Sequence, residues 1–412
     1  MGCAIKFYLS DTMTVTSELI SLGEDTEVAL YRNIKAVPDT WDQLAPKHNI
    51  FLERTYLTVL EKFPPREMQF AYLVFYQNKK PVGIAIGQIQ LFRANQNIQE
   101  EKTDAGLLGR IGSFVKDKVA EKISFYTLVC GNLLLTGEHG FYFSAQINIS
   151  NQVDLLYRGL NGVLPKLGEQ GTEVSAILIK EIKEENKDRI GTDLGKYYQE
   201  FSMQPNMVFE LDPNWRTFQD YVDCISSKYR VRMKRAFKKA AAIRKQPLDL
   251  DLMIANKKQI HEMYLGVANN SDFNSAELHE DYFIELKRAF PESFQLTGYF
   301  IGDELIGYYT TIKNHAELEA HFLGFDYEKN RIYQTYLNVL FDIIRDGIAA
   351  DTKKIVFART ALEIKSSIGA EPEEMYFYAR HRSKLSNRLL QSMVEFLQPE
   401  SPQWIQRRPF KK

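Results

Sequence analysis

The chain has 412 residues, of which 44% are hydrophobic and 25% are charged, and its formal net charge at pH 7 is -1. This length suits two domains better than one core, and this composition excludes a largely disordered or fibrous protein. The near-neutral charge argues against a surface that binds nucleic acid over its whole area, but it allows a local basic patch.

The cysteines and the apolar runs indicate the compartment. The three cysteines, Cys3, Cys130 and Cys224, have neither the density of a disulfide framework nor the spacing of metal ligands. The first residues, MGCAIKFYLSDTM, lack the apolar core of a signal peptide. No run reaches the roughly 18 apolar residues of a membrane span. We therefore expect a cytoplasmic protein, with any membrane contact peripheral and at the inner face.

A pattern of strand, polar turn and strand occurs once in each half of the chain. It follows a Phe-Pro pair that begins at Phe63 in the first half and at Phe290 in the second. The turns read QNKK and GDE, which are typical of hairpins, and the second strands contain Gly83 and Gly307. The sequence thus predicts an internal repeat.

The repeat continues beyond the hairpins. Residues 153–167 and 333–348 carry apolar side chains at helical spacing and end near a glycine. A short apolar run follows each of them, at 175–180 and 354–359. We therefore predict two copies of one mixed α/β unit.

The first copy contains an insertion at about 93–125 that predicts an amphipathic helix. Its apolar stripe consists of Leu107, Leu108, Ile111, Phe114, Val115, Val119 and Ile123. Such a helix suits a membrane surface or the cover of an apolar substrate tunnel, but packing on its own domain is the favoured interpretation.

A helical connector at 214–246 separates the copies and carries a dense run of bases. They are Lys228, Arg230, Arg232, Lys234, Arg235, Lys238, Lys239, Arg244 and Lys245. A solvated face and a surface for a phosphate-rich ligand explain this run equally well. The predicted domains are 1–213, with the insertion, and 247–412, with a C-terminal helix and a basic tail.

In layout, from about residue 28 to about 398, the chain resembles the tandem GNAT proteins of the FemAB-like, or peptidoglycan-bridge aminoacyltransferase-like, group. The resemblance lies in KYRVRMKRAFKKAA, in FDYEKNRIYQTYLNVLFDIIRDGI and in ARTALEIKSSIGAEP. In the last of these, Glu363, Lys365 and Gly369 are similar to a Lys-x-x-x-Gly element of the family. The resemblance implies an α/β fold with two mixed-sheet GNAT-like domains and a transferase that moves acyl or aminoacyl groups.

The expected donor site departs from the common acetyltransferase pattern. Such enzymes carry a Gln/Arg-x-x-Gly-x-Gly/Ala loop whose amides hold a pyrophosphate at a helix N-terminus. The equivalent stretch here, YEKNRIYQ at 327–334, has no glycine, which hinders close approach of the backbone. The donor-binding residues that we expect are Arg331, Tyr333, Gln334 and Asn338. The donor itself stays open among acyl-CoA, an acyl carrier protein and a charged tRNA.

Acyl transfer to an amine needs a base, a donor to the oxyanion and an acid, but neither a covalent nucleophile nor a metal. Alternation on the strand 317–325 places Glu317, Glu319 and His321 on one face, and Leu318, Ala320 and Phe322 on the other. A carboxylate beside an imidazole would raise its basicity, so we predict Glu319 and His321 as catalytic; ordinary outward polar residues are the alternative.

Further candidates surround this strand. Tyr308 is the predicted acid, with Tyr309 and Tyr336 as other candidates, although packing is the favoured interpretation of each tyrosine in a chain that has 22 of them. The substrate-binding candidates are Arg359, Glu363, Lys365, Arg230 and Lys234, for which a carboxylate, phosphate or oxyanion ligand competes with plain salt bridges.

Three functions are compatible with these residues. The favoured one is N-acylation of an amine, such as a bacterial sphingoid or other lipid amine, from an acyl-CoA or acyl carrier protein thioester. The second is aminoacyl transfer from a charged tRNA to a cell-wall precursor, with the basic connector as the tRNA-binding arm. The third is a binding protein that kept the fold and lost catalysis.

Overall fold

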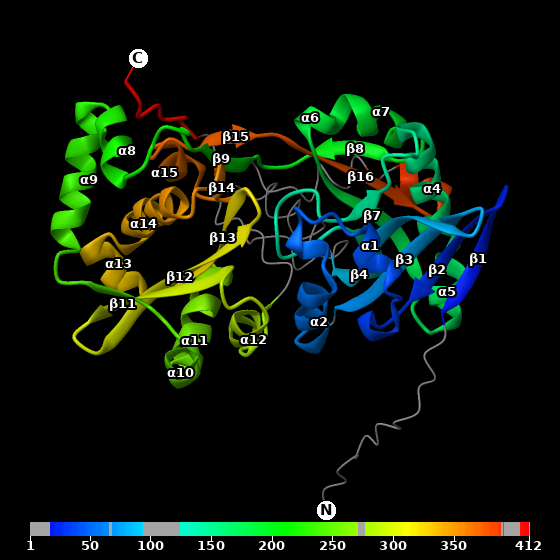
Figure 1. Cartoon of the computed structure of the whole chain (residues 1–412), viewed down its shortest axis with the longest axis horizontal. Helices are drawn as coiled ribbons and strands as arrows, with labels where there is room; N and C mark the ends of the chain where they lie inside the picture. Colours follow the sequence, from blue (N-terminus) through cyan, green and yellow to red (C-terminus); the bar gives the residue numbers. More distant parts are fainter. Residues whose placement is uncertain are drawn as a thin grey trace, which may run out of the picture.

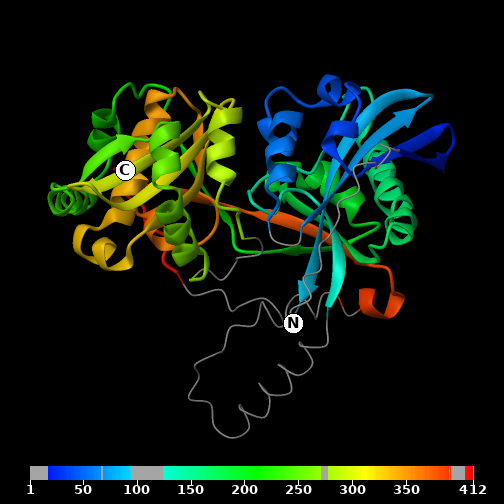
Figure 2. The same ribbon diagram turned by 90° about the horizontal axis from the view of Figure 1, so that it is seen from below.

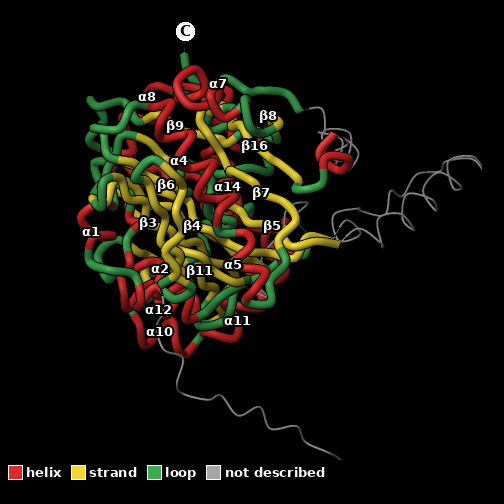
Figure 3. The backbone as a smooth tube through the Cα atoms, turned by 90° about the vertical axis from the view of Figure 1, so that its right-hand side faces the viewer, coloured by secondary structure: helices red, strands yellow, loops and turns green. Residues whose placement is uncertain are grey.

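The computed structural model describes residues 17–65, 68–93, 124–270, 277–388, 390 and 404–411. Two lobes lie side by side, and each is built on one mixed sheet (Figures 1 and 2). Viewed from the first lobe, the strands run through the middle of the molecule and helices lie mainly around them (Figure 3). The expected α/β class is therefore confirmed.

The sheet of the first lobe has the strand order β1-β2-β3-β4-β5-β7-β16-β8, with β6 paired to β4. Its strands are β1 (Glu18–Gly23), β2 (Thr26–Tyr31), β3 (Gln69–Gln77), β4 (Lys80–Arg93), β5 (Ser124–Cys130), β6 (Phe141–Phe143), β7 (Val174–Lys183), β8 (Gln199–Ser202) and β16 (Met375–His381). All pairs are antiparallel except β5 with β7.

The sheet of the second lobe has the order β10-β11-β12-β13-β14-β9-β15. Its strands are β9 (Asn206–Glu210), β10 (Arg244–Pro247), β11 (Phe294–Ile301), β12 (Glu304–Asn314), β13 (Glu317–Phe325), β14 (Lys354–Val356) and β15 (Glu371–Glu373). Here β13 and β14 form the parallel pair.

Helices cover both sheets. Those of the first lobe are α1 (Thr40–Leu44), α2 (Arg54–Lys62), α4 (Ile149–Gly162), α5 (Leu164–Glu169), α6 (Glu184–Asn186) and α7 (Thr192–Leu194), with a π-helix at Lys187–Gly191 and short 3-10 helices at Ile34–Ala36 and Ile50–Leu52. Those of the second lobe are α8 (Phe218–Cys224), α9 (Ser227–Lys239), α10 (Leu250–Ala255), α11 (Lys257–Ala268), α12 (Tyr282–Ala289), α13 (Tyr327–Tyr333), α14 (Thr335–Ala349) and α15 (Leu362–Ser366).

The internal repeat is confirmed down to the register of the hairpins. In the first lobe Phe75 pairs with Gly83, and the register then shifts by one residue. In the second lobe Tyr299 pairs with Gly307, and the same shift follows. In each lobe the hairpin is followed by a strand, a helix and a parallel strand, which is the core order of the acetyltransferase fold.

The two lobes exchange one strand each. Strand β9 follows β8 of the first sheet but pairs with β14 and β15 of the second. Strand β16 follows β15 of the second sheet but pairs with β7 and β8 of the first. The chain therefore crosses between the sheets twice, through β8 to β9 and through β15 to β16 (Figure 1). The sheets themselves thus do not divide at one point in the sequence, and the domain boundaries given above stay a prediction.

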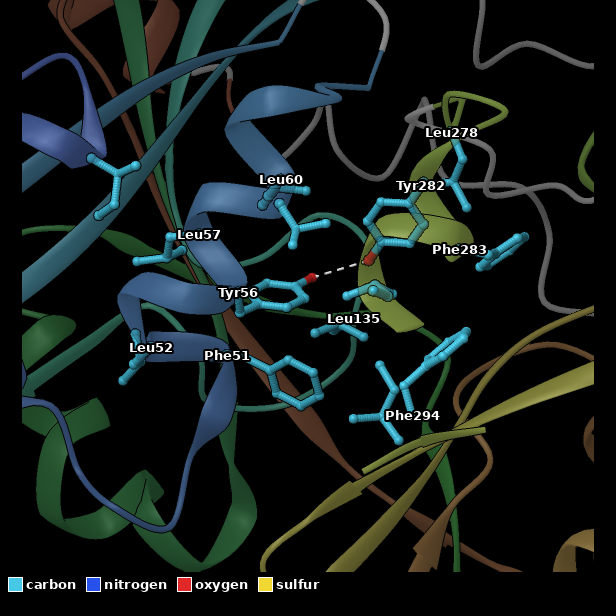
Figure 4. Packing of buried hydrophobic residues seen from close by; sticks show 14 of the residues in the cluster. Phe51, Leu52, Tyr56, Leu57, Leu60, Leu135, Leu278, Tyr282, Phe283 and Phe294 are labelled. Atoms are coloured by element: carbon cyan, nitrogen blue, oxygen red, sulfur yellow. Dashed lines mark hydrogen bonds between the residues drawn. The ribbon is translucent and has the colours of Figure 1, made fainter. Parts of the chain in front are cut away.

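A hydrophobic cluster joins the lobes through helices α2 and α12. Figure 4 shows Tyr56 of α2 and Tyr282 of α12 facing each other, with their hydroxyl oxygens 3.4 Å apart. At the edge of this interface Lys62 forms an ion pair of 2.9 Å with Glu285. The α2 and α12 helices precede the two copies of the hairpin, so equivalent elements meet at the lobe boundary.

Several predicted segments lie partly or wholly outside the described residues. The amphipathic insertion at about 93–125 is one of them, apart from its two ends, and most of the C-terminal helix is another. The basic tail is described: Phe410 forms a bridge with Ile225, and Arg407 pairs with Glu363. Of the helices in the described ranges, none combines the length and apolar character that crossing a bilayer requires.

Gly83 is required by the packing behind the first hairpin. A Cβ atom at this position would lie 2.2 Å from the ring of Phe143. We expect Gly83→Ala to lower the free energy of unfolding by about 1–3 kcal/mol, since overpacking forces neighbours to shift. Gly168→Ala is the control, because a Cβ atom there meets no atom within 4 Å. Urea unfolding midpoints measure the stability of both variants. Equal midpoints would contradict the close packing of residue 83 against the Phe143 ring.

Candidate functional site

The second sheet opens between its two parallel strands. Strand β14 pairs with β13 only from Glu317 to Glu319 and ends at Val356, whereas β13 continues to Phe325. Phe357 and Ala358 still exchange backbone hydrogen bonds with Met207 of β9, and the chain leaves the sheet after them. In the first lobe β5 ends at Cys130, where it pairs with Ile179, and β7 continues to Lys183. In the described residues, the strand that continues past the parallel pairing is thus β13 in the second lobe and β7 in the first.

A buried lysine holds the segment that leaves the sheet. Ala358, Thr360 and Ala361 have positive φ angles of 56°, 69° and 48°, which non-glycine residues seldom adopt. The ammonium of Lys365 donates to the carbonyls of Phe357 (2.6 Å), Ala358 (3.2 Å) and Arg359 (2.6 Å). Burial lowers the pKa of Lys365 to about 7. Its three donors are thus directed at the backbone rather than at a ligand.

A cavity of about 540 Å³ passes through the opening, and we call it the apolar cavity. On one face of the sheet its lining includes Leu340, Ile343 and Phe357, which belong to the cluster around α14. On the other face it includes Tyr264 and Phe322, which belong to the cluster between the lobes. The apolar cavity therefore connects the two faces of the second sheet.

A second cavity of about 510 Å³ adjoins the paired part of β13 and β14, and we call it the acidic cavity. The charged residues in its lining, apart from histidines, are Glu138, Glu185, Glu317, Glu319, Glu373, Lys183 and Lys354. Both lysines are near Glu317, at 3.8 Å for Lys183 and 3.0 Å for Lys354. The excess of glutamates makes this cavity suitable for a cation.

Glu319 lies where β14 stops pairing and lines the acidic cavity. It is only 4% exposed and forms no hydrogen bond with another described residue. Burial, and secondarily the charge of Glu317, raises the pKa of Glu319 well above its ordinary value. A buried carboxyl that has no partner and a raised pKa is an effective proton acceptor once ionised.

His321 lines the apolar cavity and belongs to a hydrogen-bonded chain between the lobes. Asn132 donates to Tyr56 (3.1 Å), Tyr56 and Tyr282 share a hydrogen bond, and the Tyr282 hydroxyl lies 3.3 Å from Nε2 of His321. Nδ1 lies 3.4 Å from Oγ1 of Thr310. Burial lowers the pKa of His321 to about 3. The expectation that a carboxylate raises its basicity is therefore wrong, since desolvation dominates.

A β-bulge changes the predicted alternation on β13. Thr311 pairs with Ala320, but Tyr309 pairs with Leu323, so β13 has one additional residue. Glu319 and His321 remain on one side of β13. Phe322 packs against the cluster between the lobes, whereas Ala320 and Leu323 pack toward α14. Phe322 is thus not on the face that strict alternation predicts, because the bulge shifts the pattern by one residue.

A buried ion cluster ties Arg359 to the first lobe. Its guanidinium lies 2.6 Å from Glu181, which is fully buried and also pairs with Lys180 and accepts from the backbone N–H of Gly137. Lys180 in turn donates to the carbonyl of Leu135 (2.6 Å). Burial raises the pKa of Glu181, but Lys180 and Arg359 outweigh this effect and hold the pKa below its ordinary value. Arg359 lines the apolar cavity and shares the single carboxylate of Glu181 with Lys180.

Two predicted residues lie away from both cavities. Tyr308 is fully buried behind β13, and its hydroxyl makes no hydrogen bond to the described part of the chain. Burial raises the pKa of Tyr308 well above its ordinary value, which makes it a weak acid. Glu363 is half exposed on α15 and pairs with Arg407 of the basic tail. The structure does not bring either side chain to Glu319.

The four expected donor-binding residues lie at the corner between α13 and α14. Gln334 adopts the left-handed conformation, with φ 53°, and Arg331 is exposed beside it. Tyr333 is half-buried, and buried Asn338 donates to the carbonyls of Gln334 (3.0 Å) and Ala236 (3.3 Å). The described lining of the apolar cavity holds their neighbours rather than these four residues, and their role in donor binding stays a prediction.

Arg230 and Lys234 lie on α9, which packs its apolar side against the cluster around α14. Lys234 is exposed, and Arg230 contacts Oγ of Ser227 at 3.3 Å. Within the described ranges, no ion pair involves either residue, and neither lines the apolar or the acidic cavity. They form part of a basic surface beside α13 and α14.

Sequence analysis did not identify several residues that line the apolar cavity. Asn330 and Tyr336 line the apolar cavity, and Oδ1 of Asn330 accepts from the N–H of Tyr336 (2.9 Å). Leu133 and Leu134 reach it from the first lobe. One signal existed for the ion cluster: Lys180 and Glu181 interrupt the otherwise apolar run SAILIKEI. Among the described residues no group of His, Cys, Asp and Glu is arranged to hold a metal.

No protein-family model and no curated protein matches this sequence. Solved structures do match it. FemX is 9% identical with a TM-score of 0.47, over 83% of this chain and 93% of that one. The tandem GNAT protein from the clavulanic acid biosynthesis pathway is 9% identical with a TM-score of 0.44, over 80% and 88%. L-PGS from Bacillus licheniformis is 9% identical with a TM-score of 0.44, over 83% and 96%. Tandem GNAT and FemX structures are thus among those that the fold resembles, as the sequence predicted.

The buried ion cluster makes a stability prediction. We expect Glu181→Gln to lower the free energy of unfolding by about 3–5 kcal/mol, since it leaves Lys180 and Arg359 buried without their counter-charge. Because the pKa of Glu181 is lowered in the folded state, its contribution is present at neutral pH and is lost as the pH falls through that pKa. Glu363→Gln removes an exposed pair and should leave the thermal midpoint unchanged. Equal midpoints for the two variants would contradict the assignment.

Proposed function

We propose that this protein is an N-acyltransferase that moves an acyl group from a thioester to an amine at the opening of the second sheet. The observation that carries the proposal is the position of Glu319, a buried carboxyl without a hydrogen-bond partner among the described residues, which lines the acidic cavity directly before the residues of β13 that line the apolar cavity. The donor lies in the apolar cavity, and the amine lies in the acidic cavity.

Glu319 serves as the general base. It removes one proton from the ammonium group of the acceptor, and the free amine attacks the thioester carbonyl carbon. A C–N bond forms and the C–S bond breaks, while the second proton of the nitrogen goes to the departing sulfur. The products are an amide and a thiol, and Glu319 releases its proton to solvent. The raised pKa of Glu319 suits this role because it makes the carboxylate a stronger base.

The backbone of β13 supplies polar groups at the reacting carbon. Past Glu319 the strand is no longer paired with β14, and residues 320–323 line the apolar cavity. Backbone N–H groups on this free edge are the candidates to bind the oxyanion of the tetrahedral intermediate.

The donor end of the cavity fits a thioester arm better than a tightly held pyrophosphate. The turn before α14 has a non-glycine residue, Gln334, in the left-handed conformation. The side chain of Asn330 already takes the N–H of Tyr336, one of the first amides of α14. Acyl-CoA and an acyl carrier protein both present such an arm, and both stay candidates for the donor.

The first lobe shapes the site rather than carrying a second one. Its loop at 131–140 contributes Leu133 and Leu134 to the apolar cavity and Glu138 and His139 to the acidic cavity. The ion cluster around Glu181 fixes this loop to Arg359. Catalysis in this proposal therefore belongs to the second lobe.

The role of Glu319 gives a direct test. We expect Glu319→Gln to lower kcat/KM about 10²- to 10⁴-fold, because the amine loses its base. The assay follows thiol release from acyl-CoA with a panel of primary amines. In the unmodified protein kcat/KM should rise with pH through the raised pKa of Glu319, and this rise should disappear in the variant. Glu292, which is exposed and lines neither cavity, provides the control variant Glu292→Gln. Full activity of Glu319→Gln would reject the mechanism.

Aminoacyl transfer from tRNA is the second candidate, and the exposed bases of α9 favour it. These bases lie beside α13 and α14, close to the donor end of the apolar cavity. If tRNA is the donor, binding should weaken steeply with salt. Charge reversal at Arg230, Lys234 and Lys238 should then abolish binding in filter assays.

The control for this experiment reverses three exposed lysines of the first lobe, Lys35, Lys47 and Lys79. Loss of tRNA binding in the α9 variant alone supports the second candidate. Equal loss in both variants, or no binding at low salt by the unmodified protein, excludes it.

A further inference from the structure

The apolar cavity continues beyond the point where the thioester would react. We call its part on the face of the second sheet that the first lobe covers the apolar chamber. The apolar residues of its lining are Leu133, Leu134, Tyr264, Val267, Ala268 and Phe322, and Asn270 also lines the cavity after the end of α11. A two-carbon acetyl group at the opening of the sheet would leave this space unused.

Both lobes build the chamber. Tyr264, Val267 and Ala268 come from α11, while the two leucines come from the loop of the first lobe. Leu133 and Leu134 also pack against the cluster between the lobes, and Leu135 lies within it. The chamber wall is thus supported from behind, so that the leucines are held in place rather than free to collapse into the space.

The charged side chains of the cavity lining, Arg359 and Lys365, are not among the residues of the chamber. Arg359 is paired with Glu181, and Lys365 directs its donors at three backbone carbonyls. His321 is neutral at physiological pH, since burial lowers its pKa to about 3. A ligand segment in the chamber meets chiefly hydrocarbon and aromatic surface, in contrast to the glutamates of the acidic cavity.

We propose that the donor carries a medium or long hydrocarbon acyl chain and that this chain occupies the apolar chamber, with Leu133 and Leu134 determining its length. The inference rests on the proposed function and names its donor class. The chain belongs to the donor rather than to the amine, because the chamber is continuous with the cavity on the thioester side, whereas the acidic cavity is separate.

Binding tests this inference without turnover. S-dodecyl pantetheine and S-ethyl pantetheine are thioethers that cannot transfer a group, and calorimetry measures their affinity for the full chain. Each buried methylene is worth about a fourfold change in affinity, so burial of only about two of the additional methylenes in the chamber would already make the dodecyl compound bind more than about tenfold more tightly. Equal affinities would overturn the inference. The same comparison with dodecylamine and ethylamine should show no such gain, and a gain there would assign the chamber to the acceptor.

A variant places the chain in the chamber. Leu134→Trp fills the space, so we expect it to reduce the preference for the dodecyl compound to about twofold or less. Leu19→Trp adds the same side chain at an exposed position of β1 and should keep the preference. Thermal midpoints establish whether both variants are folded. The comparison of the two thioethers in the unmodified protein does not depend on either variant. A preference that survives in folded Leu134→Trp would overturn the inference.

Turnover separates this inference from the function on which it rests. Tighter binding of the dodecyl compound without transfer from any acyl-CoA would contradict the proposed function and keep a chain-binding chamber. Transfer from acetyl-CoA with equal thioether affinities would keep the function and reject the chamber. Faster transfer from dodecanoyl-CoA than from acetyl-CoA, lost in Leu134→Trp, would support both.

Discussion

The exchange of β9 and β16 between the sheets is the constraint on which the rest of the molecule depends. Each sheet is completed by a strand that the chain reaches only after crossing from the other lobe. The chain crosses between the lobes through residues 203–205 and again through residue 374, so two short connections limit how far the lobes can separate, and the cluster between the lobes adds to this restraint. A loop of the first lobe can therefore form a fixed wall of a cavity in the second.

The two copies have the same order of elements, but they differ at the end of the parallel strands. In the proposed mechanism this difference gives the two lobes different roles. In the first lobe β5 ends at Cys130 and the chain turns into the loop that reaches the boundary. In the second lobe β13 continues, and three residues with positive φ carry the other strand away. Burying Lys365 opposes folding, since desolvation disfavours its charge, but its three backbone bonds hold this unusual segment open. The opening is thus built into the fold rather than created by a ligand.

Local patterns predicted the repeat well, because hairpin turns and helical spacing are properties of adjacent residues. The exchange of strands was not predictable in this way, since a short apolar run such as 375–381 does not indicate which sheet it joins. The same limit applied to the site. Glu319 was identified from alternation alone, but the bulge that moves Phe322 and the burial that makes His321 a weak base depend on contacts distant in the sequence.

In the proposed mechanism, the opposite character of the two cavities couples acceptor binding to proton transfer. A cation in the acidic cavity favours the ionised form of Glu319, and by linkage the ionised carboxylate raises the affinity for that cation by the same factor. Burial disfavours the ionised form of Glu319 and raises its pKa, and an ammonium group in the acidic cavity would oppose this effect. An apolar donor beside it excludes water from the reacting carbonyl, which strengthens each electrostatic interaction there. The apolar chamber on one side of β13 and the glutamates of the acidic cavity on the other therefore both serve the proposed mechanism.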